Sequence, residues 1–310
     1  MHAETSRPAA ATATELLPQL YEQMVFIRRF EETLLEMFAE GKLVGTTHTY
    51  IGQEADAAGV IDHLEPERDV VFSNHRCHGH YLAFTGDAFG LLSEVMGKAT
   101  GTCGGKGGSQ HLCKGNFYSN GVQGSIVPVS TGIALAEKEK GSGAVTTVFL
   151  GDGTLGQGAV YECLNMASLW RLPLLFVVEN NEYAQTTPRT LAFAGSFTDR
   201  AAAFGIATDE LATTDVREIH EAAGRAVRHV RETGTPFFLV LHTYRFSPHS
   251  KGDDFRDAAE IEERRRRDPL LVAGAALDEA TRTAIEEACE RRLAETVAAA
   301  EAAPDAGAAP

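Results

Sequence analysis

Apolar residues recur at helical spacing near the start of the chain. Between Glu15 and Glu40 they fall three or four positions apart, which is the spacing of one buried helix face. Gly41 follows directly, and glycine commonly ends a helix. We therefore predict an amphipathic helix over residues 15–40. Its apolar positions are Leu16, Leu17, Leu20, Met24, Ile27, Phe30, Leu34, Leu35 and Phe38.

The middle of the chain alternates apolar runs with helical patterns. AVTTVFL at 144–150 is followed by GDGTLGQG, by the helical pattern AVYECLNMASLW, and by a second apolar run, LPLLFVVE. Strands this apolar are buried on both faces, as in a parallel sheet. A helical pattern at 216–232 and an apolar run at 236–245 repeat the order. We therefore predict an α/β fold with a parallel sheet flanked by helices.

The two ends depart from this pattern. Residues 1–14 are small, polar and rich in Ala and Thr, which predicts a flexible tail before an α/β domain over residues 15–272. Residues 273–310 predict a helical extension whose Ala-rich end frays. Within the domain, the glycine-rich segment 97–124 should lack regular structure.

Composition and charge narrow the possible partners. The 310-residue chain is 44% hydrophobic, which predicts a globular protein. Its net charge of −15 predicts that it would repel nucleic acid. No apolar run reaches the roughly 18 residues that span a bilayer, and the N-terminus lacks an apolar signal core. The five cysteines are scattered and form no CxxC pair, which favours reduced thiols. We expect a cytoplasmic protein with no membrane or nucleic-acid partner.

The turn after the first apolar run is a candidate phosphate-binding loop. Gly151, Gly153 and Gly156 form a GxGxxG pattern, and Glu179 ends the next predicted strand, where a ribose-binding acid would lie. An NAD-dependent oxidoreductase is therefore one alternative. Asp152 argues against it, because a carboxylate would repel a pyrophosphate at this turn. A divalent metal ion between the two anions removes the conflict.

Asn181 is the natural second ligand for such an ion. It follows Asp152 by 29 positions, which one turn, one crossover helix and one strand account for. Both side chains should therefore lie at the carboxyl edge of the sheet, where open α/β sheets bind ligands. Hard oxygen ligands of this kind suit Mg²⁺.

GDG followed by about two dozen residues and then NN resembles the thiamin diphosphate motif. From Tyr21 to Pro269 the chain is similar to the alpha subunit of the decarboxylating component of 2-oxo-acid dehydrogenase complexes, of the pyruvate, branched-chain and acetoin type. The stretches that carry the resemblance are VFIRRFEE, IGQEA, HRCHGH, GKGGSQH, NGVQGSIVPVSTGIALA, ENNEYA and TYRFSPHSKGDD.

The resemblance implies a thiamin diphosphate cofactor held through Mg²⁺. Asp152, Asn181 and the backbone carbonyl of Tyr183 would bind the ion, and Gly153 and Thr154 would donate backbone N–H groups to the diphosphate.

The same resemblance assigns a role to part of the stretch SNHRCHGH, residues 73–80. His75 and Arg76 occupy a position pair that is often Tyr-Arg in this family and contacts the cofactor phosphates. A zinc site here is the weaker alternative, because a second, separated pair of ligands is missing. His78 and His80 are expected to pack against or cap nearby structure.

The resemblance also implies catalytic and closing groups. His48 would face the substrate, and His249, on the mobile loop at 244–258, would act in catalysis and contact the cofactor. Gly121 and Gln123 would touch the aminopyrimidine through their main chain.

Two features of the 244–258 loop leave questions open. Phe246-Ser247-Pro248 departs from the family pattern, so the loop conformation and the choice of 2-oxo acid stay open. Ser250 stands where mitochondrial relatives are phosphorylated, and an ordinary loop serine is the favoured alternative.

A single diphosphate-binding domain implies that a second subunit completes the active site. A transketolase-like beta subunit would supply the carboxylate beside the aminopyrimidine, which gives an alpha2beta2 heterotetramer active on a small 2-oxo acid. The acyl group would pass to a lipoyl group on an acyltransferase partner. The alternatives are a carboligase or transketolase-like subunit with a small-molecule acceptor, and a regulatory subunit without turnover.

Overall fold

The fold is described from a computed structural model that covers residues 12–43, 45–250, 252 and 254–307. Its helices are α1 (Leu17–Ala39), α2 (Glu54–Ile61), α3 (His78–Thr85), α4 (Ala88–Val95), α5 (Ile126–Lys140), α6 (Gly158–Leu169), α7 (Arg189–Ala192), α8 (Phe197–Ala202), α9 (Val216–Thr233), α10 (Ala258–Arg265), α11 (Pro269–Gly274), α12 (Glu279–Ala302) and the short 3₁₀ helix η1 (Asp152–Gly156). Its strands are β1 (Val70–Ser73), β2 (Cys113–Lys114), β3 (Phe117–Ser119), β4 (Thr146–Gly151), β5 (Leu174–Asn180), β6 (Tyr183–Ala184), β7 (Thr187–Pro188), β8 (Ala207–Leu211) and β9 (Phe237–His242).

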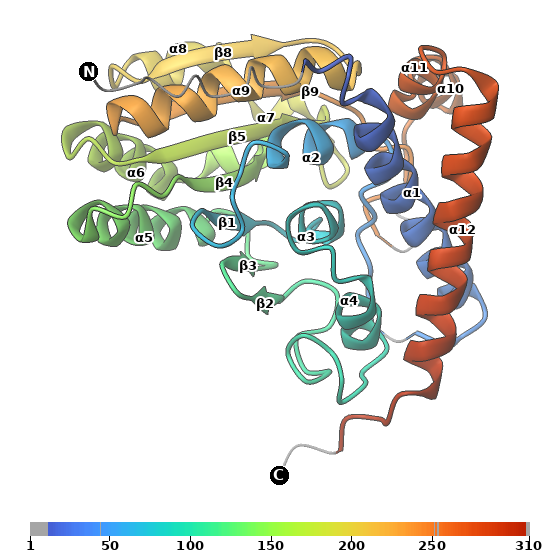
Figure 1. The fold of residues 1–310 in the computed structure, drawn as a ribbon. Helices are drawn as coiled ribbons and strands as arrows, with labels where there is room; N and C mark the ends of the chain where they lie inside the picture. The colour runs from blue at the N-terminus through green and yellow to red at the C-terminus, as the bar shows by residue number, and fades with distance from the viewer. Residues whose placement is uncertain (1–11, 44, 251, 253, 308–310) are drawn as a thin grey trace, which may run out of the picture.

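A seven-stranded sheet forms the centre of the fold, in the order β2-β3-β1-β4-β5-β9-β8 (Figure 1). Every neighbouring pair is parallel except β2 and β3. Gly151 at the end of β4 aligns with Glu179 near the end of β5. The carboxyl ends of these strands therefore meet at one edge, and the predicted α/β fold is confirmed.

Side chains alternate between two apolar layers, one on each face of the sheet. The layer shared with α1, α2, α3 and α9 includes Val71, Phe149, Val177 and Leu239. The layer shared with α5, α6 and α8 includes Phe72, Val148, Phe176 and Phe238. Because both faces are covered, the central strands are apolar throughout, as the sequence predicted.

The predicted helix at 15–40 is confirmed as α1, and α12 runs beside it (Figure 1). The N–H of Ala99 donates to Pro304 O (2.8 Å) and the N–H of Ala306 donates to Gly97 O (2.9 Å). These two bonds attach the end of the chain to the segment after α4 as far as Ala306, and the predicted fraying stays a prediction. Most of the predicted tail, residues 1–11, lies outside the described residues.

The glycine-rich segment 97–124 is irregular over most of its length, but it contributes β2 and β3 to the sheet. Phe117 of β3 pairs with Val71 of β1. No sequence pattern indicates these strands, since they span only two and three residues.

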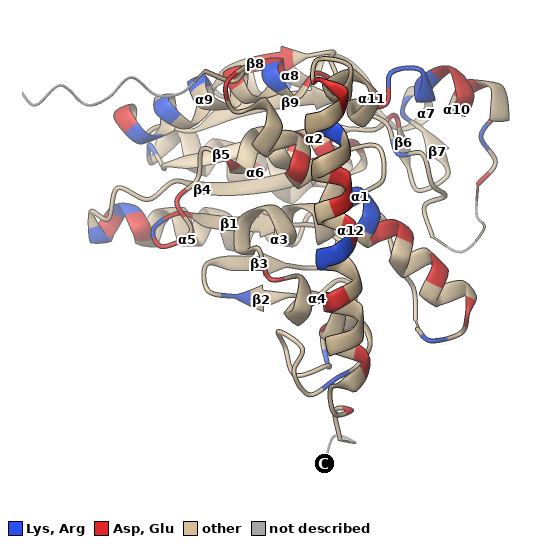
Figure 2. Cartoon of the chain, turned by 45° about the vertical axis from the view of Figure 1, so that its right-hand side comes forward, with Lys and Arg blue, Asp and Glu red and all other residues tan. Residues whose placement is uncertain are grey.

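Charged residues of both signs are interspersed on α9, α10 and α12 (Figure 2). Arg266, in the arginine run at 264–267, pairs with Glu263 (3.0 Å). Among the described residues, every helix is too short or too polar to cross a membrane.

Candidate cofactor-binding site

One pocket of about 320 Å³ opens at the carboxyl edge of the sheet, beyond β1, β4 and β5. Four further residues, Gln110, Gly151, Ala184 and Gln185, line it beside the predicted ones. The structure thus brings all eleven predicted site residues together, although their roles stay predictions. They are His48, His75, Arg76, Gly121, Gln123, Asp152, Gly153, Thr154, Asn181, Tyr183 and His249.

Asp152 and Asn181 are adjacent because β4 and β5 are parallel neighbours. Asp152 begins η1 directly after β4, and Asn181 directly follows β5. Only 4% of Asp152 is exposed, and burial raises the pKa of its carboxyl to about 6, with a smaller contribution from Glu182. A buried carboxyl of this kind is stabilised in its charged form by a cation. The donor set therefore fits Mg²⁺.

A hydrogen bond to a residue distant in sequence orients the Asn181 side chain. Its Nδ2 donates to Gln53 Oε1 (3.2 Å), and the N–H of Tyr183 donates to its Oδ1 (3.3 Å). These contacts fix which end of the amide carries the oxygen that an ion would need.

The backbone around Tyr183 is strained. Glu182 (φ 69°) and Gln185 (φ 58°) are two of three non-glycine residues with positive φ among the described residues. Such residues collect at ligand sites, where the surroundings hold an unfavourable backbone in place. This bend sets the direction of the Tyr183 carbonyl.

Close packing and side-chain bonds shape the phosphate-binding turn. A Cβ added to Gly153 would lie 2.7 Å from Ala184 Cβ, so the site requires a glycine here. Thr154 Oγ1 donates to Gln123 Oε1 (2.6 Å), and the amide nitrogen of Gln123 contacts His75 Nδ1. The sequence had suggested a main-chain role alone for Gln123, and the structure adds one for its side chain.

Arg76 is a buried cation facing the same pocket. It is 3% exposed, and burial, followed by Arg245, lowers the pKa of its guanidinium to about 9. Across the part of the chain that the structure describes, no carboxylate lies within ion-pair distance of Arg76. Buried charges in proteins are normally paired, which favours an anionic ligand beside Arg76.

The remaining histidines of SNHRCHGH are packing residues, as predicted. His78 Nδ1 pairs with Glu31 (3.1 Å), while His80 pairs with Glu179 (3.0 Å) and stacks on Phe149. Both are fully buried, and neither lies in a group of potential metal ligands among the described residues.

A family model described as "Dehydrogenase E1 component" matches residues 22–309. The chain belongs to the dehydrogenase E1 component family.

Curated relatives agree with this assignment. The alpha subunit of acetoin:2,6-dichlorophenolindophenol oxidoreductase from Cupriavidus necator is 41% identical over 296 residues, which cover 93% of this chain and 89% of that protein. The alpha subunit of the pyruvate dehydrogenase E1 component from Rickettsia felis is 38% identical over 258 residues, or 81% of this chain and 79% of that protein. The Bacillus subtilis acetoin enzyme's alpha subunit is 41% identical over 238 residues, or 76% and 71%.

The departure at Phe246 in this E1 chain has a packing explanation. Phe246 is buried in an apolar cluster with Ile51 and Tyr244, and its N–H donates to Ile51 O (3.0 Å). The first half of the 244–258 loop is thereby attached to the IGQEA segment next to Gln53. Lys251 and Asp253 of this loop lie outside the described residues.

Sequence reasoning missed one residue that supports the glycine-rich segment of this E1 chain. Glu94 of α4 accepts backbone N–H bonds from four positions of the glycine-rich segment: Cys103 (2.7 Å), Gly105 (2.9 Å), Gly107 (2.5 Å) and Gly108 (3.2 Å). This places one buried carboxylate at the centre of the turns formed by residues 103–108. The glycines themselves were the one available signal, since turns rich in exposed N–H groups attract an anion.

Proposed function

We propose that this chain is the alpha subunit of a thiamin diphosphate- and Mg²⁺-dependent 2-oxo-acid decarboxylating dehydrogenase. The observation that carries the proposal is the pair of buried charges in one pocket. Within the described residues, neither Arg76 nor Asp152 has an ion-pair partner of opposite charge. An Mg²⁺–diphosphate group supplies both at once, whereas a nicotinamide dinucleotide alone would leave Asp152 facing a phosphate.

Thiamin diphosphate, when bound, supplies the electron sink for loss of carbon dioxide from a 2-oxo acid. The chain's own residues bind and orient it. Asp152, Asn181 and the Tyr183 carbonyl would hold the ion. Phosphate oxygens would accept from Arg76, His75, His249 and the N–H groups of Gly153 and Thr154.

Other pocket residues act on the substrate side. His48 Nδ1 contacts Gln110 Nε2 (3.1 Å), and this contact orients the imidazole ring. From the pocket lining, the ring can hold or deliver a proton. The main chain of Gly121 and Gln123 would contact the aminopyrimidine.

The alpha-subunit names of the relatives support a beta-subunit partner. We propose that the active assembly is an alpha2beta2 heterotetramer. We propose that the acyl group passes to a lipoyl group on an acyltransferase. The five cysteines are free thiols, which suits a reducing, cytoplasmic setting.

Calorimetric titration of the purified alpha–beta pair tests the proposal. Thiamin diphosphate should bind in the presence of Mg²⁺ and be lost on chelation, and NAD should give no heat. Binding of NAD in competition with thiamin diphosphate would contradict the proposal.

A further inference from the structure

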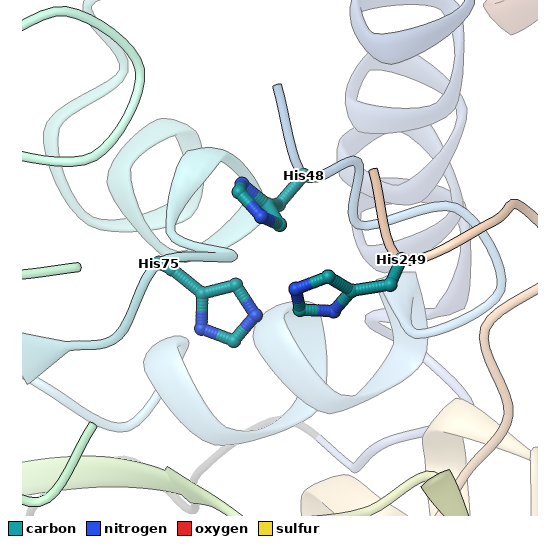
Figure 3. A group of neighbouring side chains, drawn as sticks. All are labelled: His48, His75 and His249. Carbon is teal, nitrogen blue, oxygen red and sulfur yellow. The ribbon is translucent and has the colours of Figure 1, made fainter. Parts of the chain in front are cut away.

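Three histidine rings of the pocket lining lie close together (Figure 3). Ring centroids lie 4.8 Å apart for His48 and His75, 4.6 Å for His48 and His249, and 5.3 Å for His75 and His249. The three come from separate loops, before α2, after β1 and after β9. One ring nitrogen from each lies within 4.8 Å of the other two.

The surroundings of His75 favour a neutral ring. Burial, with the neighbouring Arg76 charge, lowers the pKa of His75 well below its ordinary value, and the other two rings act in the same direction. Three neutral imidazoles close together are a donor set for Zn²⁺ and related ions such as Co²⁺, Ni²⁺ and Cu²⁺. Mg²⁺ prefers oxygen ligands, so this set differs in chemistry from Asp152 and Asn181.

Glutamine amides support two of the rings. Gln110 contacts Nδ1 of His48 (3.1 Å) and Gln123 contacts Nδ1 of His75. The Nε2 atom of His75 is buried and makes no hydrogen bond within the described residues. A histidine that binds an ion through one nitrogen carries its proton on the other nitrogen and donates it to an acceptor. Each glutamine amide therefore turns to present its oxygen to Nδ1 when the ion binds at Nε2.

We propose that His48, His75 and His249 bind one zinc-class transition-metal ion when the diphosphate cofactor is absent, and that this ion and the cofactor exclude each other. A tetrahedral ion with Zn–N bonds of 2.0–2.1 Å sets its nitrogens about 3.4 Å apart, so the widest gap must close by roughly 1.4 Å. Rotation of the His249 side chain on its loop can provide this. The mutual exclusion rests on the proposed function, whereas the metal site itself does not.

Cobalt provides a direct readout on the full-length chain, because tetrahedral Co²⁺ has visible absorption bands. We expect one Co²⁺ per chain, displaced by Zn²⁺, with affinity reduced at least about tenfold in each of His48→Gln, His75→Gln and His249→Gln. The exposed His111 provides the control variant His111→Gln, which should bind as the parent does. Circular dichroism confirms that each variant is folded. Equal affinity in all four variants and the parent would overturn the site.

Competition is measured on the assembled alpha–beta pair. Thiamin diphosphate with Mg²⁺ should abolish the cobalt bands at saturation. Retention of the bands would overturn the mutual exclusion, provided that calorimetry on the same preparation shows cofactor binding. Absence of cofactor binding in that calorimetry would instead count against the proposed function.

Discussion

Asn181 donates a hydrogen bond to Gln53 across 3.2 Å, although the two residues are 128 positions apart in the chain. Gln53 is 1% exposed and lies just before α2. Its side chain therefore acts on the candidate ion site from an element that has no ligand of its own.

Gln53→Leu should weaken Mg²⁺ binding without removing a ligand. Loss of the acceptor frees the Asn181 amide to turn, and loss of such supporting contacts typically lowers metal affinity about 10- to 100-fold. Magnesium titration of the alpha–beta pair at fixed thiamin diphosphate measures the change. Gln19→Leu, at an exposed position of α1, is the matched control. An unchanged Mg²⁺ requirement would remove Gln53 from the site.

Asp152→Ala should abolish Mg²⁺-dependent cofactor binding and leave the fold intact. Because burial raises the pKa of this carboxyl to about 6, its ionised form at pH 7 lowers the stability of the cofactor-free chain. We therefore expect the variant to unfold at the same temperature as the parent or slightly higher. Calorimetry and thermal unfolding test the two parts, with exposed Glu139→Ala as control. Retained binding would contradict the assignment of Asp152.

Arg76→Ala should weaken cofactor binding by about 1.5 to 3 kcal/mol, the range of a hydrogen bond to a charged group, which is roughly 10- to 150-fold in dissociation constant. Arg76→Lys should recover only part of the loss, because an ammonium lacks the planar fork. Calorimetry with thiamin diphosphate measures both. Arg291→Ala on the exposed side of α12 is the control. A neutral result for Arg76→Ala would leave its burial unexplained.

Two glycines of the same turn should respond differently to alanine. A Cβ at Gly153 would press on Ala184 at 2.7 Å, whereas a Cβ at Gly156 meets no atom within 4 Å. Gly153→Ala should therefore displace the turn and weaken cofactor binding, and Gly156→Ala should not. Equal affinities of the two variants would show that the turn tolerates the displacement.

The His63–His220 contact should make stability depend on pH. Burial, followed by His220, lowers the pKa of His63 to about 4; Arg228 acts in the same direction and Asp62 opposes it. The unfolded chain takes up this proton near pH 6.5, so the folded state loses stability as the pH falls from about 6.5 to 4, by at most about 1.4 kcal/mol per pH unit. Urea unfolding at several pH values should show a shallower dependence for His63→Gln. The exposed-site variant His111→Gln should follow the parent.

Elements with strong local patterns were predictable. The helical period predicted α1 and α9, and apolar runs predicted β4, β5 and β9, because burial against both layers imposes these patterns on the sequence. The strands β2 and β3 were missed since their pairing with β1, and not their own composition, makes them strands.

The same distinction applies to the site. Asp152 and Asn181 were predictable because each directly follows a strand of one βαβ unit. The contact of Gln53 with Asn181 depends on packing between distant segments, which no local pattern encodes. The meeting of His48, His75 and His249 was missed for the same reason, although each had been named separately.

Glu94 is a further residue that shapes a segment to which it does not belong. Its two carboxylate oxygens accept hydrogen bonds from four backbone N–H groups of the glycine-rich segment 97–124. Glu94 itself lies on α4, before that segment begins. Random mutagenesis limited to the glycine-rich segment would therefore never sample a position that holds four of its backbone N–H groups. Any redesign of residues 103–108 therefore has to keep the Glu94 carboxylate on the preceding helix.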